Sequence, residues 1–421
     1  MSDHPPSVGR RRFGHQIVRM TGRNTHQGHR AATPLELLFD LTFVVAFGQA
    51  SDQFAHIVAE GHVVPGIFAF GFAVLGIFLA WTNFSWFSSA YDTDDWLYRI
   101  TTMVQMIGVV VFALGLPALF ASLEEGQTVD NGVLVAGYVI MRVAMIVQWA
   151  RVARDDPERR RTAIAYAGVI GIAQVGWVTL AVLHTSVLVF AIAAVVLTVL
   201  EVAGPRLAER KSSGTPWHPE HIAERYGLLA IVALGEGIFG TVAAVSVLVE
   251  DQGWSVEAVL VVVAGVGLTF GLWWNYFIVP SGLVLERRRE RSFLWGWAHY
   301  FIYGSIVATG AGLHIAAYVL AGESEVGVFG AIVAVAVPVL IFSVTLFVLY
   351  GYLVREADPF HIILFAGTLL LLFAAIVLAS AGATLGLCLM IVTLSPAVIV
   401  VGYEILGHKH EEAVLERVLK S

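Results

Sequence analysis

Basic and acidic gaps alternate between the long apolar runs of this 421-residue chain. The gaps at 151–161 and 287–291 hold five and four arginines, whereas the gaps at 122–131 and 250–257 hold carboxylates and no Lys or Arg. Basic loops stay on the cytoplasmic side during membrane insertion, so every second gap is predicted to face the cytoplasm. The alternation therefore predicts a chain that crosses a membrane repeatedly.

The composition agrees with a membrane protein, because the mean hydropathy is +0.77 and charged residues make up only 14% of the chain. Soluble domains carry about 25% charged residues, and a spanning helix needs about 20 mostly apolar ones. We therefore predict an all-α polytopic membrane protein with about twelve transmembrane helices and both termini in the cytoplasm. The predicted spans are 34–56, 63–88, 97–121, 129–150, 162–183, 185–203, 220–248, 255–279, 292–320, 326–350, 360–380 and 383–406.

Similar short segments recur six spans apart. Trp81-Thr82-Asn83-Phe84 closes the second predicted span, and Trp273-Trp274-Asn275-Tyr276 closes the eighth. An even number of spans separates the copies, so the pattern favours two parallel six-helix repeats with a site at their interface. The predicted parts are a disordered basic N-terminal segment (1–32), two six-helix halves (33–203 and 220–406), a cytoplasmic linker (204–219) and a cytoplasmic tail (407–421) that forms a short amphipathic helix.

The span ends carry recognisable signals. Thr33 to Glu36 has the pattern of a capping box with proline at the first helical position. The basic loops on the cytoplasmic side suit contact with anionic lipid headgroups. Aromatic residues near span ends are interpreted as interfacial belts; examples are Trp81, Trp86, Trp96, Trp254 and Trp295.

Charged residues inside spans are costly and therefore point to a functional or pairing role. Asp40, Arg142 and Glu236 lie deepest, and we expect Arg142 to pair with Asp40 or Glu236. They either form a structural ion pair or line a polar site for protons, ions or a small solute. The remaining positions have simpler explanations. Glu36 either caps a helix or binds a ligand, and Glu201 is expected to be solvated near an inner span end. Glu224 and Arg225 either extend to the lipid headgroups or line the inner mouth.

Other chemistries are not indicated. Cys388 is the only cysteine, which excludes an internal disulfide. The spacing of His218, His221 and Glu224 does not predict a metal site, because His218 lies at a helix cap. No nucleotide-binding loop or hydrolase motif is present, so we predict no cofactor, no metal and no nucleic-acid partner.

Two long motifs resemble those of the bacterial low temperature requirement A (LtrA) family. They are residues 33–44 (TPLELLFDLTFV) and 224–236 (ERYGLLAIVALGE), with shorter similarities at 92–95, 138–142 and 273–277. Gly237 departs from the pattern, because the family more often has serine there. The resemblance implies a multi-pass protein of the bacterial plasma membrane and no defined activity. The matching motif residues are Glu36, Phe39, Asp40, Arg142, Glu224, Arg225, Gly235 and Glu236.

The favoured function is secondary transport, or ion or proton permeation, through an intramembrane polar site. The candidate site comprises Asp40, Arg142 and Glu236, with Glu36, Glu224 and Arg225 nearer the inner mouth. One alternative is a non-catalytic protein that supports envelope function or growth in the cold. An intramembrane enzyme is the less favoured class, since no nucleophile or metal set is evident. The solute, the coupling ion and the oligomeric state stay open.

Overall fold

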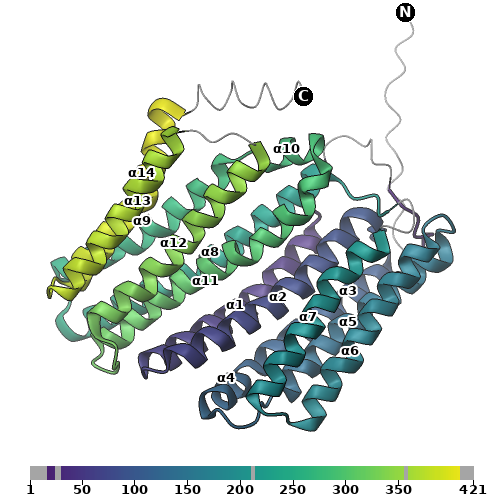
Figure 1. Cartoon of the computed structure of the whole chain (residues 1–421), viewed down its shortest axis with the longest axis horizontal. Coiled ribbons are helices and arrows are strands. Elements are labelled where there is room, and N and C mark those ends of the chain that lie inside the picture. Colours follow the sequence, from purple (N-terminus) through teal and green to yellow (C-terminus); the bar gives the residue numbers. More distant parts are fainter. Residues whose placement is uncertain (1–16, 24–29, 210–213, 355–358, 408–421) are drawn as a thin grey trace, which may run out of the picture.

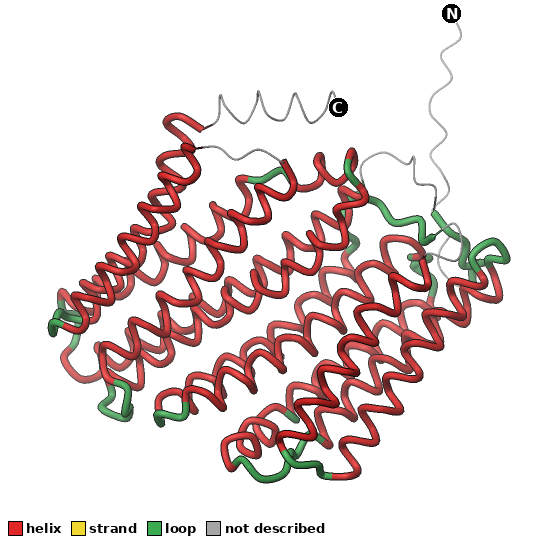
Figure 2. Tube along the Cα trace, viewed as in Figure 1, coloured by secondary structure: helices red, strands yellow, loops and turns green. Residues whose placement is uncertain are grey.

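The computed structural model describes residues 17–23, 30–209, 214–354 and 359–407. Within these ranges the chain is helical, without a β-strand, as Figure 2 shows. Twelve helical segments are long and apolar enough to cross a membrane. The prediction of an all-α polytopic membrane protein is thereby confirmed, and the surroundings of the helices are a lipid bilayer.

The first six spans lie on one side of the molecule (Figure 1). Their helices are α1 (Pro34–Ala59), α2 (Val63–Tyr91), α3 (Trp96–Leu114), α4 (Leu116–Glu125), α5 (Gly132–Asp155), α6 (Arg160–Leu183) and α7 (Val187–Glu209).

The third predicted span is one crossing made of two helices, because it breaks at Gly115 between α3 and α4. Pro117 follows at once, and its ring and missing N–H prevent the α-helical ladder from continuing. Gly115 also lies against α5: a Cβ there would come within 2.2 Å of the Leu134 nitrogen. Glycine is therefore required for this close approach of the two helices.

The last six spans form the other side. They comprise α8 (Pro219–Gln252), α9 (Val256–Ile278), α10 (Ser281–Arg287), the 3₁₀ turn η1 (Arg289–Arg291), α11 (Ser292–Leu320), α12 (Gly327–Val354), α13 (Pro359–Ser380), α14 (Leu385–Gly402) and the π-helical turn η2 (Tyr403–Gly407). Short turns connect α6 to α7 after Leu183 and α13 to α14 after Ser380.

The two sides meet through four helices. α1 packs on α8 and α11, and α2 also contacts α8 and α11. Within the first side the packing order is α1–α3–α5–α6–α7, and within the second it is α8–α11–α12–α13–α14. The central helices α1, α8 and α11 therefore hold the residues that are furthest from lipid.

The capping predictions for α1 and α8 are confirmed. The Thr33 hydroxyl accepts the Glu36 N–H at 3.2 Å, and the Glu36 carboxylate accepts the Thr33 N–H at 2.8 Å. His218 caps α8 by accepting the His221 N–H at 3.4 Å, in line with its predicted position before the helix.

The prediction that residues 1–32 are disordered is wrong for 17–23 and 30–32. Met20 is fully buried, and its N–H donates to Asp155 at 3.1 Å. The Val18 N–H donates to Asp95 at 3.0 Å. Carboxylates at the ends of α3 and α5 therefore hold this segment in place. They lie on the membrane face that carries the arginine-rich loops, which is called the basic face below. Residues 1–16 and 24–29, and the predicted amphipathic tail 408–421, lie outside the described residues.

Candidate functional site

The most deeply buried ion pair joins α1 to α8. The Arg225 Nε donates to Asp40 Oδ2 at 3.1 Å, and its Nη1 lies 3.2 Å from Glu36 Oε1. None of the three side chains is more than 2% exposed. The structure thus brings together three of the predicted site residues, and Arg225 does not snorkel to headgroups.

This cluster extends to the basic face through the segment that precedes α1. Arg30 lies 3.2 Å from Glu36 and 3.1 Å from Asp92, and Arg23 lies 3.2 Å from Asp92. The His221 Nε2 is 3.3 Å from Glu36. Glu36 is therefore both the helix cap and an ion-pair partner. The cluster balances three cations against three anions: Arg23, Arg30 and Arg225 against Glu36, Asp40 and Asp92.

Glu224 lies at the edge of this cluster and holds the chain that enters α1. Its carboxylate accepts the Ala32 N–H at 3.2 Å. The position is at the start of α8, as expected for a residue at the inner mouth.

Arg142 pairs with neither Asp40 nor Glu236, so that prediction is wrong. Its Nη2 donates to Glu201 of α7 and to the Tyr138 hydroxyl. Trp177 Nε1 donates to the second Glu201 oxygen at 2.9 Å. Glu201 is only 6% exposed, so its predicted solvation is also wrong. The cause is topological: α5, α6 and α7 form one flank of the molecule, away from α1 and α8.

Glu236 has a different environment from the other buried charges. It is 2% exposed, and within the described ranges no Arg, Lys or His comes within salt-bridge distance. Ser51 of α1 is its polar neighbour. A Cβ at Gly48 would lie 3.3 Å from Glu236 Oε1, and one at Gly310 would lie 2.6 Å from its backbone. Small residues on α1 and α11 therefore make room for this carboxylate.

A layer of buried aromatic rings from α2, α8 and α11 lies beside the Asp40–Arg225 pair. The Tyr226 ring contacts Trp81, Trp295 and His299, with centroids 4.6–4.8 Å apart. Trp81 also donates to Asp40 at 2.7 Å. Trp81 and Trp295 are fully buried, so their interpretation as interfacial residues is wrong. Packing against α8 and α11 removes both indoles from lipid.

A cavity of about 280 Å³ opens between the two sides of the molecule on the basic face. It extends from Glu209 and Trp217 near that face to Phe78 and Glu201 deeper in the membrane. Aromatic and polar side chains of α2, α5, α6, α7, α8, η1, α11 and the loop before α8 form its wall. They include Phe78, Thr82, Asn83, Trp86, Phe87, Trp149, Tyr166, Glu201, Arg206, Glu209, Thr215, Trp217, Tyr226, Glu290, Ser292, Phe293 and Trp297.

The family described as bacterial low temperature requirement A protein (LtrA) matches residues 31–396, which is most of the chain. The chain belongs to the LtrA family. An uncharacterized protein of Rhizobium meliloti (strain 1021) is 26% identical to this LtrA protein over 314 residues, covering 69% of this chain and 70% of the relative. No solved structure matches the present chain.

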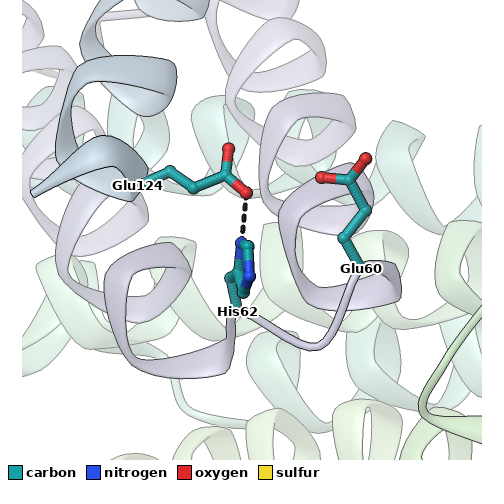
Figure 3. A group of neighbouring side chains, drawn as sticks. All are labelled: Glu60, His62 and Glu124. Carbon is teal, nitrogen blue, oxygen red and sulfur yellow. Dashed lines mark hydrogen bonds and ion pairs between the residues drawn. The ribbon is translucent and has the colours of Figure 1, made fainter.

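One group on the opposite face of this LtrA protein has donors suited to a metal ion. Glu60, His62 and Glu124 place their ligand atoms within 4.8 Å of one another, as Figure 3 shows. His62 Nδ1 and a Glu124 oxygen are in direct contact, and Glu60 lies 3.5 Å from His56. Glu60 and His62 are exposed, and these two pairs account for the arrangement without an ion.

The positions of several of these residues were not predicted from the sequence of the LtrA chain. Arg30 lies before the first apolar run, and nothing in its spacing predicts that it is 8% exposed. Glu209, Trp217 and Phe293 come from three separate elements, and only the fold brings them to one cavity. Glu201 did carry a signal, since it lies within an apolar run eight residues from the end of α7.

Proposed function

We propose that this LtrA protein is a secondary transporter that moves a small solute through the space between its two sides. The observation that carries the proposal is the cavity between α2, α7, α8 and α11, which opens toward the basic face. Its deep end lies against Phe78, whose ring contacts the buried ring of Tyr303 at 6.1 Å. A solute chamber open to one face and sealed from the other is what alternating access requires of a resting state.

The Asp40–Arg225 pair and the aromatic layer supply the seal in this proposal. The pair joins α1 to α8, and Tyr303 donates to the backbone oxygen of Tyr226 at 2.9 Å, which joins α11 to α8. These links would separate and reform as the two sides rock. The balanced charges of the cluster suit it to holding helices together, because no net charge remains to attract a permeating ion.

Glu236 supplies the coupling in this proposal. It lies eleven residues beyond Arg225 on α8, about 16 Å further from the basic face by the helical rise of ~1.5 Å per residue. A buried carboxylate without a counter-charge is costly, and such residues in spans mark proton or ion pathways. We propose that Glu236 exchanges a proton during the cycle.

The two-repeat organisation belongs to the same proposal. The packing order α8–α11–α12–α13–α14 parallels α1–α3–α5–α6–α7, which supports two related six-helix halves. The arginine-rich loops favour a cytoplasmic basic face and a plasma-membrane location, with anionic headgroups near those loops.

A flux assay tests the proposal. The purified full-length protein is placed in liposomes that contain a pH-sensitive dye, and small cations and metabolites are added outside one at a time. We expect at least one solute to move protons in the native protein and not in the Glu236→Gln variant. Glu250→Gln is the matched control, because Glu250 lies on the same helix and is exposed.

Two outcomes contradict transport: no solute in the panel producing flux above protein-free liposomes, or equal flux from Glu236→Gln. The balanced ion-pair cluster favours the structural alternative in that case. A Glu236→Gln chain that still supports bacterial growth in the cold would then identify a non-transporting membrane protein.

A further inference from the structure

We propose that the basic-face cavity binds a small organic ammonium cation. The transport step rests on the proposed function, but the binding site is argued from the cavity alone. The observation that carries it is a ring of aromatic side chains combined with one carboxylate, that of Glu209, which has no cationic partner among the described residues.

Aromatic pairs from separate segments of the chain form part of the wall. Trp86 of α2 lies edge-on to Trp217 with centroids 4.9 Å apart, and Phe78 lies edge-on to Trp297 at 5.4 Å. The faces of such rings are electron-rich and attract ammonium groups that lie within about 6 Å of the centroid.

Rings of this wall already hold cations in the structure. The Arg206 guanidinium lies 4.6 Å from the centroid of Phe293, and that of Arg289 lies 4.7 Å from the centroid of Trp217. The first contact joins α7 to α11 across the cavity. The local field therefore favours positive charge over these faces.

The charges of the wall point the same way. Three carboxylates line the cavity (Glu201, Glu209 and Glu290) against one guanidinium, that of Arg206. Arg142, behind the wall, balances Glu201. Arg291 lies 3.8 Å from Glu290 and pairs with it, so Glu209 is the wall carboxylate that has no cationic partner among the described residues.

Glu209 is the carboxylate best placed to meet the solute. Its oxygens accept from the Tyr166 hydroxyl at 2.8 Å and from the Thr215 N–H and hydroxyl at 2.8 and 2.9 Å. These donors are neutral, and no salt bridge to Glu209 is present in the described part of the chain. Gly214, at φ +72°, brings the loop so close that a Cβ would lie 2.7 Å from Glu209. The loop thus orients the charge of Glu209 without cancelling it.

The size of the cavity limits the solute. A volume of about 280 Å³ equals roughly nine water molecules at ~30 Å³ each. It lies at the lower end of ligand sites, which span about 300–1,000 Å³. An ammonium group with a few alkyl substituents fits, whereas a peptide or a lipid chain does not.

The test is calorimetric titration of the purified full-length protein with choline and with its neutral isostere 3,3-dimethyl-1-butanol. We expect saturable binding of choline and roughly tenfold weaker binding of the alcohol, from the contribution of a desolvated cation–π contact. Glu209→Gln should weaken choline binding, and Arg206→Gln should strengthen it, since it removes the cation of the wall. Glu125→Gln, an exposed carboxylate outside the cavity, should leave binding unchanged.

Equal binding of the two probes, or binding of neither, overturns the assignment. The opposite signs expected for Glu209→Gln and Arg206→Gln guard against general loss of folding, because a misfolded chain weakens binding in both. Choline that binds but is not taken up into liposomes would refute transport and leave the site in place.

Discussion

Breaking the Arg142–Glu201 pair should affect stability unequally from its two ends. Only Nη2 of Arg142 is hydrogen-bonded, and its Nε and Nη1 have no partner among the described residues. Glu201→Gln therefore leaves a buried guanidinium without an anion, and removal of one partner of such a pair costs about 3–5 kcal/mol.

The opposite change should cost less. Arg142→Met leaves Glu201 with two neutral donors, the Tyr138 hydroxyl and Trp177 Nε1. Hydrogen bonds to a charged group contribute about 1.5–3 kcal/mol each, so we expect a loss of about 2–3 kcal/mol. The double variant, Arg142→Met with Glu201→Gln, buries no charge. Its amide oxygen can accept from Trp177, and its NH2 group can donate to the Tyr138 hydroxyl. It should lie within about 1–2 kcal/mol of the native protein.

The measurement is an SDS titration of each variant in mixed micelles, followed by tryptophan fluorescence, with Trp177 at the site as a local reporter. A double-mutant cycle isolates the coupling between the two side chains. Additive losses in the double variant would refute the pairing. So would rescue of Arg142→Met by Asp40→Asn or Glu236→Gln, since the structure places both far from α5.

Two further perturbations test the packing and the basic face. Gly137→Ala places a Cβ 2.2 Å from the Phe112 nitrogen and should lower the melting temperature by several degrees. The control Gly168→Ala has nothing within 4 Å of its Cβ, so its melting temperature should equal or exceed that of the native protein. Equal melting temperatures for the two variants would contradict the packing of α3 on α5. Burial raises the pKa of Asp95, but Arg151 and two backbone N–H donors outweigh this and hold that pKa below its usual value. The stabilisation is therefore present above the ordinary Asp pKa of ~3.9 and is lost as pH falls through the folded value, so native and Asp95→Asn proteins should converge in melting temperature only under acid.

The fold was predictable because membrane insertion leaves a strong mark on sequence. Charge alternation and the lengths of apolar runs gave the spans, and Thr33 and Glu36 gave the start of α1. The spans and the helix start each depend on residues that are close together in the sequence. The helix break at Gly115 also has a local cause in the sequence, because Pro117 interrupts the helix. The apolar run that contains it is long enough to cross the membrane once.

The partners of buried charges were not predictable in the same way. Depth along a helix follows from counting residues, so Arg142 was correctly expected to need an anion. Which anion depends on which helices are adjacent, and α7 supplies Glu201 because α5, α6 and α7 pack in order. Arg30 shows the same limit: its burial depends on α2 and on Asp92, which the sequence does not place beside it.

The cost of burial identifies which charged residues need an explanation. The charges around each residue then distinguish a role in helix packing from a role in a binding or proton site. Asp40 and Arg225 cancel each other and join α1 to α8, so their removal should first destabilise the helix contact. Glu236 and Glu209 have no cationic partner in the part of the chain that the structure describes. Tyr166 of α6 donates to Glu209 of α7 at 2.8 Å, so this carboxylate also links two helices. In the proposed function, a proton at Glu236 and a positively charged solute at Glu209 supply the missing positive charge.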